Sequence, residues 1–102
     1  MPMSVVIVRN APDRFRGFLA SCMLEAAPGI YSHPEMSRGV RERIWGVLED
    51  WFVSANGASV VLLWADKSVH GGLGILTLGE PPRSLLDYDG VILSRLEHNQ
   101  NK

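Results

Sequence analysis

The apolar residues of this chain follow two kinds of spacing, which predict strands and helices in turn. Residues 3–9, 58–65 and 73–78 are apolar at almost every position, a pattern typical of strands buried on both faces. Residues 15–26 and 40–52 carry apolar side chains three and four positions apart, which predicts two amphipathic helices. The first helical stripe comprises Phe15, Phe18, Leu19, Cys22, Met23 and Ala26. The second comprises Val40, Ile44, Trp45, Val47, Leu48, Trp51 and Phe52.

Capping residues and helix-breaking residues set the expected ends of these helices. Asn10 is a suitable cap for the first helix, and Pro12 fits its first turn because the missing N–H has no helical partner there. The pair at 28–29, Pro-Gly, ends that helix. Ser37 is the expected cap of the second helix, and the Asn-Gly pair at 56–57 ends it.

The remaining segments complete an α+β architecture. Residues 29–32 predict a short second strand, and residues 66–72 form the connection of a hairpin between the two later apolar strands. A proline-rich break at 80–83 precedes a last strand at 91–96. The predicted fold is a ferredoxin-like sandwich, with two helices on one face of a mostly antiparallel sheet. We expect a single domain over residues 1–96 and a loose polar tail over residues 97–102.

The predicted sheet has a second face that also needs cover. Both the 58–65 run and the 73–78 run are apolar on their two faces, so the face without helices remains largely apolar. We therefore expect a homodimer that closes over this face of the sheet.

Composition places the chain among ordinary globular domains of the cytoplasm. It has 102 residues, 46% of them hydrophobic, and a net charge of −1. The longest apolar run spans six residues, 60–65, against the roughly 20 that a membrane span needs. No secretory signal is visible, and a single cysteine fits a reducing, cytoplasmic compartment.

The positive charge is concentrated in the first half of the chain and consists mainly of arginine. Residues 1–43 carry six arginines against four acids, whereas residues 44–102 carry four basic and seven acidic side chains. Arg14 and Arg16 stand at the start of the first helix, where the macrodipole disfavours cations and unpaired N–H groups favour an anion. We therefore expect phosphate contact there. A solvated face with ordinary pairs, such as Arg38 with Glu42, is the alternative.

Three aspartates are candidates for metal-dependent chemistry. Asp66 follows an apolar strand, and Asp87 and Asp89 flank Tyr88 just before the last strand. A Mg²⁺-dependent nuclease needs acids that converge on the ion. The alternative interpretation is that these residues build turns with their own backbone.

For the histidines, the cysteine and the glycine-rich segment, the sequence favours structural roles over catalytic or ligand-binding ones. The three histidines have no ligand spacing and no cysteine partner, so we expect no zinc site. Cys22 lies on the first apolar stripe and is predicted to be a small core residue. The glycine-rich segment 70–74 lies between two strands, which favours a hairpin loop over a phosphate-binding loop.

The sequence resembles one known family over almost all its length, from about Val5 to Leu96. The matching segments are 5–19, 28–31, 41–45, 60–65, 77–79 and 87–90. Together they are similar to the small CRISPR-associated adaptation protein, the second of the two near-universal spacer-acquisition proteins, in its type I-E form. The resemblance implies a ferredoxin-like homodimer that bridges two dimers of the adaptation integrase and supports protospacer duplex DNA for insertion into the repeat array.

The resemblance also implies which residues contact DNA and which segment binds the integrase. Arginines at the start of the first helix and in the loop after the fourth strand contact the DNA backbone, and they correspond to Arg14, Arg16 and Arg83. A neighbouring loop position, basic in some relatives, is Pro82 here. The region from Val91 onward corresponds to the part that docks the integrase.

Many members of that family are described as Mg²⁺-dependent endonucleases on RNA or double-stranded DNA. The acid that would hold the metal lies at the end of the first strand, where this chain has Arg9, with Asn10 next to it. Because arginine cannot ligate Mg²⁺, we expect no catalytic residue, no metal site and no required cofactor here. Mg²⁺ would be needed only under the alternative nuclease function.

Overall fold

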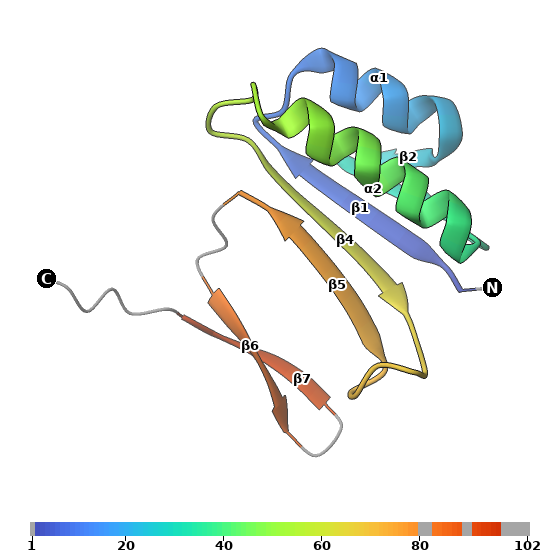
Figure 1. Cartoon of the computed structure of the whole chain (residues 1–102), viewed down its shortest axis with the longest axis vertical. Helices are drawn as coiled ribbons and strands as arrows, with labels where there is room; N and C mark the ends of the chain where they lie inside the picture. Colours follow the sequence, from blue (N-terminus) through green and yellow to red (C-terminus); the bar gives the residue numbers. More distant parts are fainter. Residues whose placement is uncertain (1, 80–82, 89–90, 97–102) are drawn as a thin grey trace, which may run out of the picture.

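Seven strands and two helices make up the part of the chain that the computed structural model describes, which is residues 2–79, 83–88 and 91–96. Their bounds are β1 Ser4–Arg9, α1 Asp13–Cys22, β2 Leu24–Ala27, β3 Ile30–His33, α2 Arg38–Phe52, β4 Ser59–Ala65, β5 Leu73–Leu78, β6 Arg83–Tyr88 and β7 Val91–Leu96. The first five strands form one sheet in the order β2-β3-β1-β4-β5, with every neighbouring pair antiparallel. Both helices lie on the same side of it (Figure 1). The elements from β1 to β4 follow the β-α-β-β-α-β order of ferredoxin-like folds.

The core lies between the two helices and one face of the sheet. Alternate residues of β1 and β4 point into it, because side chains alternate between the faces of a strand. Phe15 and Leu19 of α1 and Leu48 of α2 are fully buried against this face. The main sheet residues of the core are Val6, Val8, Tyr31, Val60 and Leu62.

The opposite face of the sheet, which we call the open face, carries apolar residues that the helices do not cover. Its half-buried apolar members on β1, β4 and β5 include Val5, Ile7, Val61, Leu63, Leu73 and Ile75. The apolar character predicted for both faces of the later strands is therefore confirmed, whereas a second copy over this face stays a proposal.

The first helix is four residues shorter than its apolar spacing predicts. It ends at Cys22, and Met23 already has extended dihedrals, φ −139° and ψ 163°. Residues 24–27 form the edge strand β2 instead, paired with β3. The prediction that Cys22 is a core residue is wrong, because its side chain is exposed, and Ala26 is exposed as well. The reason is that β2 gains backbone hydrogen bonds from β3, whereas small side chains such as Cys22 and Ala26 add little apolar burial to a longer helix.

Pro28 and Gly29 therefore form the turn of a hairpin and do not end a helix. Gly29 has φ +80°, and its oxygen accepts a hydrogen bond of 2.8 Å from the N–H of Val8. A Cβ atom at Gly29 would lie 2.6 Å from the Val8 oxygen, so only glycine fits this approach.

The two predicted helix caps have different outcomes. Ser37 caps α2, and its Oγ accepts a 3.2 Å hydrogen bond from the N–H of Val40, as predicted. Asn10 does not cap α1: it adopts the left-handed region with φ 56°, and Pro12 takes the N-cap position without a side-chain cap bond. Asn tolerates that conformation better than other non-glycine residues, which makes it suitable for the sharp exit from β1.

The end of the chain contains one strand more than predicted. Residues 91–96 form β7 with the predicted bounds, and β6 pairs with it in a separate two-stranded antiparallel sheet. Apolar pairs such as Leu86 with Leu93 are in register there. The proline-rich residues 80–82 and the tail 97–102 lie outside the described residues.

Candidate functional site

Three exposed arginines stand where β1 passes into α1, and we call them the arginine edge: Arg9, Arg14 and Arg16. Arg9 is the last residue of β1, opposite Ser59 of β4. Arg14 and Arg16 belong to the first turn of α1. None of the three makes an ion pair with an acid of the described segments. The edge thus presents guanidinium groups to solvent at the helix end that favours anions.

Arg14 is held in place by the end of α2. Its guanidinium stacks on the Trp51 ring at 4.8 Å from the ring centroid. It also donates hydrogen bonds to Ser54 Oγ (3.2 Å) and to the carbonyl oxygen of Trp51 (3.5 Å). Carbonyl groups at a helix C-terminus attract cations, so α2 offsets the unfavourable position of Arg14 at the start of α1. Spacing within one helix does not predict this contact, because it joins residues of two helices that are 37 positions apart.

Arg16 faces the other way, toward the β2–β3 hairpin. It lies close enough to Tyr31 that a hydrogen bond and its positive charge favour the ionised phenol. Burial and the nearby Glu25 carboxylate outweigh this effect and raise the pKa of Tyr31, whose hydroxyl donates to Glu25 Oε2 at 3.3 Å. The divergence of Arg14 and Arg16 around α1 agrees with a spacing of two residues on a helix.

The third predicted DNA contact lies apart from this edge in the sequence. Arg83 is the first residue of β6, where it pairs with Leu96 of β7. Its position at the start of a strand differs from the loop position that the sequence predicts. The placement of its side chain lies outside what the structure describes.

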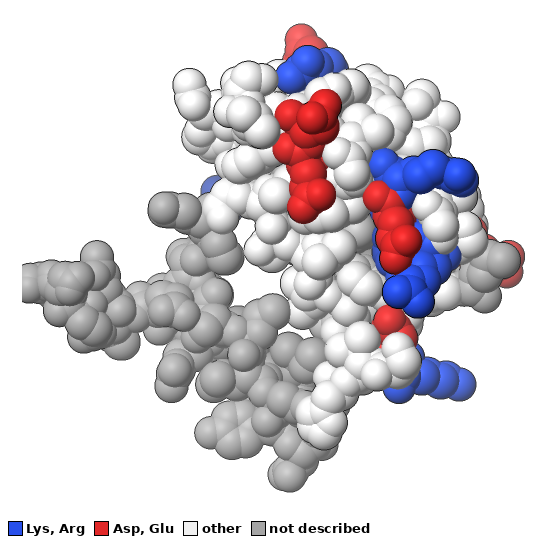
Figure 2. Space-filling model, viewed as in Figure 1, with Lys and Arg blue, Asp and Glu red and all other residues white. Residues whose placement is uncertain are grey.

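Charges of both signs are interspersed on the face that carries α2. Figure 2 shows basic and acidic side chains side by side there, without a large area of one sign. Arg38 pairs with Glu42 one turn further along α2, with Nε and Oε2 2.9 Å apart, which is the pair named in the alternative interpretation of the arginines. This pair is exposed and contributes little to stability.

Asp66 is engaged in the turn that follows β4. Its Oδ1 accepts hydrogen bonds from the N–H and the hydroxyl of Ser68, at 2.9 and 2.6 Å, and its Oδ2 accepts from Trp64 Nε1 at 3.1 Å. The bonds from Ser68 and then that from Trp64 lower the pKa of Asp66. The turn interpretation of this residue is confirmed.

The described residues bring no cluster of potential metal ligands together. No group of three or more histidine, cysteine, aspartate or glutamate side chains in those segments could hold a metal ion. Asp87 belongs to β6, but its side chain and the whole of Asp89 lie outside the described residues. The predicted roles of these two aspartates therefore stay predictions.

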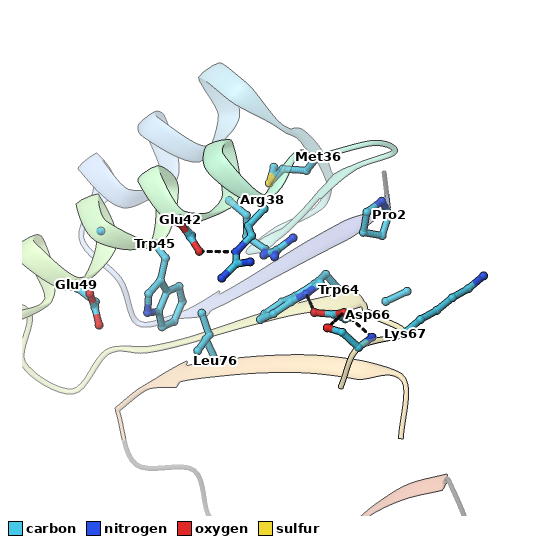
Figure 3. Close-up of a pocket in the computed structure, with 14 residues that line it drawn as sticks. Pro2, Met36, Arg38, Glu42, Trp45, Glu49, Trp64, Asp66, Lys67 and Leu76 are labelled. Carbon is cyan, nitrogen blue, oxygen red and sulfur yellow. Dashed lines mark hydrogen bonds and ion pairs between the residues drawn. The ribbon is translucent and has the colours of Figure 1, made fainter. Parts of the chain in front are cut away.

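A pocket of about 810 Å³ opens between α2 and the β4–β5 hairpin (Figure 3). Arg41 lines it and is buried, with its guanidinium carbon 4.2 Å from the centroid of the Trp64 ring. Trp64 covers Gly74 on β5, where a Cβ atom would collide with the indole ring. The burial of Arg41 was not predicted from the sequence. Its spacing to Ile44, Trp45 and Leu48, at three, four and seven residues, was the signal that it shares the buried face.

The family model for CRISPR-associated proteins named Cas_Cas2CT1978 matches residues 3–93. The chain belongs to this Cas2-like family. The match spans every element from β1 to β6 and the start of β7. It therefore covers the arginine edge, the open face and the pocket together.

In this Cas2-like chain, the arginine edge includes the end of β1. Arg9 stands there as an exposed cation, beside Asn10 at φ 56°. Neither side chain supplies the carboxylate that a Mg²⁺ site at this point would need. No helix in residues 2–79, 83–88 and 91–96 is long and apolar enough to cross a membrane.

Proposed function

We propose that the chain is a spacer-acquisition subunit of a CRISPR system, of the type I-E subfamily, which bridges integrase dimers and supports protospacer duplex DNA. Membership in the Cas2-like family carries this proposal. The arginine edge supports it, because Arg9, Arg14 and Arg16 are exposed and have no acidic partner in the described segments. Guanidinium groups of this kind suit phosphate oxygens.

The DNA would run along the start of α1. Arg14 and Arg16 point to different sides of the helix, so each would contact a separate phosphate and not share one. Arg83 would add a contact from the start of β6. Such contacts position a duplex without reading its sequence, which suits a protein that accepts foreign DNA of any sequence.

A homodimer would form through the open face, whose apolar residues lie on β1, β4 and β5. A second copy would remove these half-buried side chains from water. The segment from Val91 onward, which begins with β7, would bind the integrase.

Co-purification with the adaptation integrase, followed by protospacer binding, tests the proposal. We expect a stable complex that binds duplex DNA, and weaker binding when both Arg14→Ala and Arg16→Ala are present. Arg43→Ala is the matched control: Arg43 is also exposed but belongs to α2, away from the arginine edge, so this change should leave binding unchanged. Failure to form the complex, or equal DNA binding by all variants, would contradict the proposal.

We also propose that the chain does not cleave nucleic acid through a Mg²⁺ site at the end of β1. Arg9 would repel the ion, and two copies at a dimer axis would repel it twice. Incubation of the purified protein with RNA and with duplex DNA, with and without Mg²⁺, provides the test. Mg²⁺-dependent cleavage that is abolished in Asp66→Asn, Asp87→Asn or Asp89→Asn would favour the nuclease function instead.

A further inference from the structure

The pocket beside α2 is separate from the arginine edge. Trp45 and Glu49 reach it from α2, whereas Trp64 and Leu76 come from β4 and β5 (Figure 3). None of the arginines of the edge lines it. Its volume of about 810 Å³ lies in the range of small-ligand sites, about 300–1,000 Å³. A ligand in this pocket would therefore bind at a different place from DNA that runs along α1.

Arg41 is the buried charge of this pocket. Its side chain is only 8% exposed, and one face of the guanidinium stacks on Trp64. No side-chain or backbone oxygen of the described residues accepts a hydrogen bond from it. Its N–H donors are not sealed from solvent, because Ser4 Oγ alone among the described side chains is a fully buried polar atom without a hydrogen-bond partner. Besides the hydrogen bonds from Ser68 and Trp64, the positive charge of Arg41 lies close enough to the Asp66 carboxylate to lower its pKa. The N–H donors of Arg41 are therefore available to an acceptor that enters the pocket.

The charges around the pocket favour a single negative charge over several. The lining cations are Arg38, Arg41 and Lys67, and the lining acids are Glu42, Glu49 and Asp66. Two of these acids are already engaged: Glu42 pairs with Arg38, and Asp66 accepts bonds from Trp64 and Ser68. A phosphate dianion would add two negative charges beside three carboxylates, whereas a carboxylate adds one and matches the planar arginine fork.

The rest of the lining suits an apolar group. Trp45 and Met36 of the helix side are buried, and Leu76 is an exposed apolar residue across from them. Gly46, between Trp45 and Val47, also lines the pocket, and a Cβ atom there would meet nothing within 4 Å. The ligand therefore has room for a bulky apolar group next to α2.

We propose that this pocket binds one carboxylate carried on an apolar body, with the carboxylate oxygens held by the edge of the Arg41 guanidinium. Two sources can supply such a carboxylate, the end of an apolar peptide segment or a free organic acid. Both share the chemistry that Arg41 recognises, so the experiment is designed to separate them.

Titration followed by two-dimensional ¹H–¹⁵N NMR of the full-length protein tests the proposal. The probes are N-acetyl-Leu-Leu with a free carboxylate, the same dipeptide as its amide, and 4-methylpentanoate. We expect the acid forms to shift the Trp64 Nε1 and Arg41 Nε resonances with a dissociation constant of about 1 mM. If only the dipeptide acid shifts these resonances, the carboxylate comes from the end of a peptide. If 4-methylpentanoate shifts them as well, a free organic acid can also occupy the pocket.

Variants of the pocket separate binding from folding. Arg41→Gln should weaken binding at least about tenfold, and Gly46→Leu should do the same by filling the space while leaving Arg41 in place. Arg43→Ala, at an exposed arginine of α2 that does not line the pocket, is the control that should keep binding. The proposal is wrong if the amide binds as well as the acid. It is also wrong if phosphate or adenosine monophosphate shifts these resonances at lower concentration, or if none of the probes shifts them at about 10 mM.

Discussion

Arg14 is involved both in the proposed binding of an anion and in the packing of α1 against α2. It is a cation available to an anion at the start of α1, and it also stacks on Trp51 and donates to Ser54 at the end of α2. Arg16 lies toward the β2–β3 hairpin instead, so the two arginines differ although they are only two residues apart. Any loss of DNA binding in a variant of Arg14 would therefore include the effect of a change in helix packing.

We expect Arg14→Ala to lower the free energy of unfolding by about 0.5–1 kcal/mol, because the variant lacks an exposed cation–π interaction. Arg43→Ala should change it by less, since Arg43 has no such interaction with the described residues. Urea denaturation of both variants provides the comparison. Equal stability of the two variants would mean that stacking on Trp51 does not stabilise the fold.

Asp66 makes stability depend on acid pH. Its pKa is lowered in the folded state, so its contribution is present above its ordinary value of 3.8 and is lost as the pH falls through the lower, folded value. We expect Asp66→Asn to reduce the loss of stability between neutral pH and about pH 3. Urea denaturation at several pH values measures this. A variant that loses as much stability on acidification as the unmodified protein contradicts the expectation.

At the scale of the elements, the strongly apolar strands and the capped second helix follow from the sequence, and the end of α1 does not. Apolar spacing continues to Ala26, but the chain leaves the helix at Cys22 because residues 24–27 pair with β3. That pairing depends on the hairpin around Gly29, which spacing within the helix cannot reveal. The pocket was not predicted for a related reason: one side of it is Trp64, which stacks on Arg41 but lies 23 residues later in the sequence.

Two glycines provide a test of this local structure. Gly39 lies in α2 with nothing within 4 Å of a Cβ atom, so Gly39→Ala should stabilise the protein by about 0.5–1 kcal/mol. Gly74→Ala should destabilise it, because the added methyl collides with the Trp64 indole. Thermal denaturation of both variants measures the difference. A destabilising Gly39→Ala, or a neutral Gly74→Ala, would contradict the packing described for α2 and β5.

At the scale of the whole molecule, a substitution on the open face tests whether the protein is a dimer. Leu63 lies near the middle of this face, between Val5 and Ile75 on the neighbouring strands. We expect Leu63→Asp to convert a dimer into monomers, because an unpaired carboxylate in an apolar interface is costly. Val53→Asp, at a residue that is 87% exposed, is the control. Sedimentation equilibrium measures the outcome, and a monomeric unmodified protein would remove the basis of the proposed dimer.

The proposed bridging of DNA is tested most directly by the salt dependence of protospacer binding in the complex with the integrase. The logarithm of the binding constant should fall linearly with the logarithm of salt concentration, with a slope of about −0.9 per phosphate neutralised. Removing Arg14 and Arg16 together should make that slope shallower by about one unit for each arginine that binds a phosphate, whereas Arg43→Ala should leave it unchanged. An identical slope and affinity for the double variant and the unmodified protein would show that the arginine edge does not contact DNA.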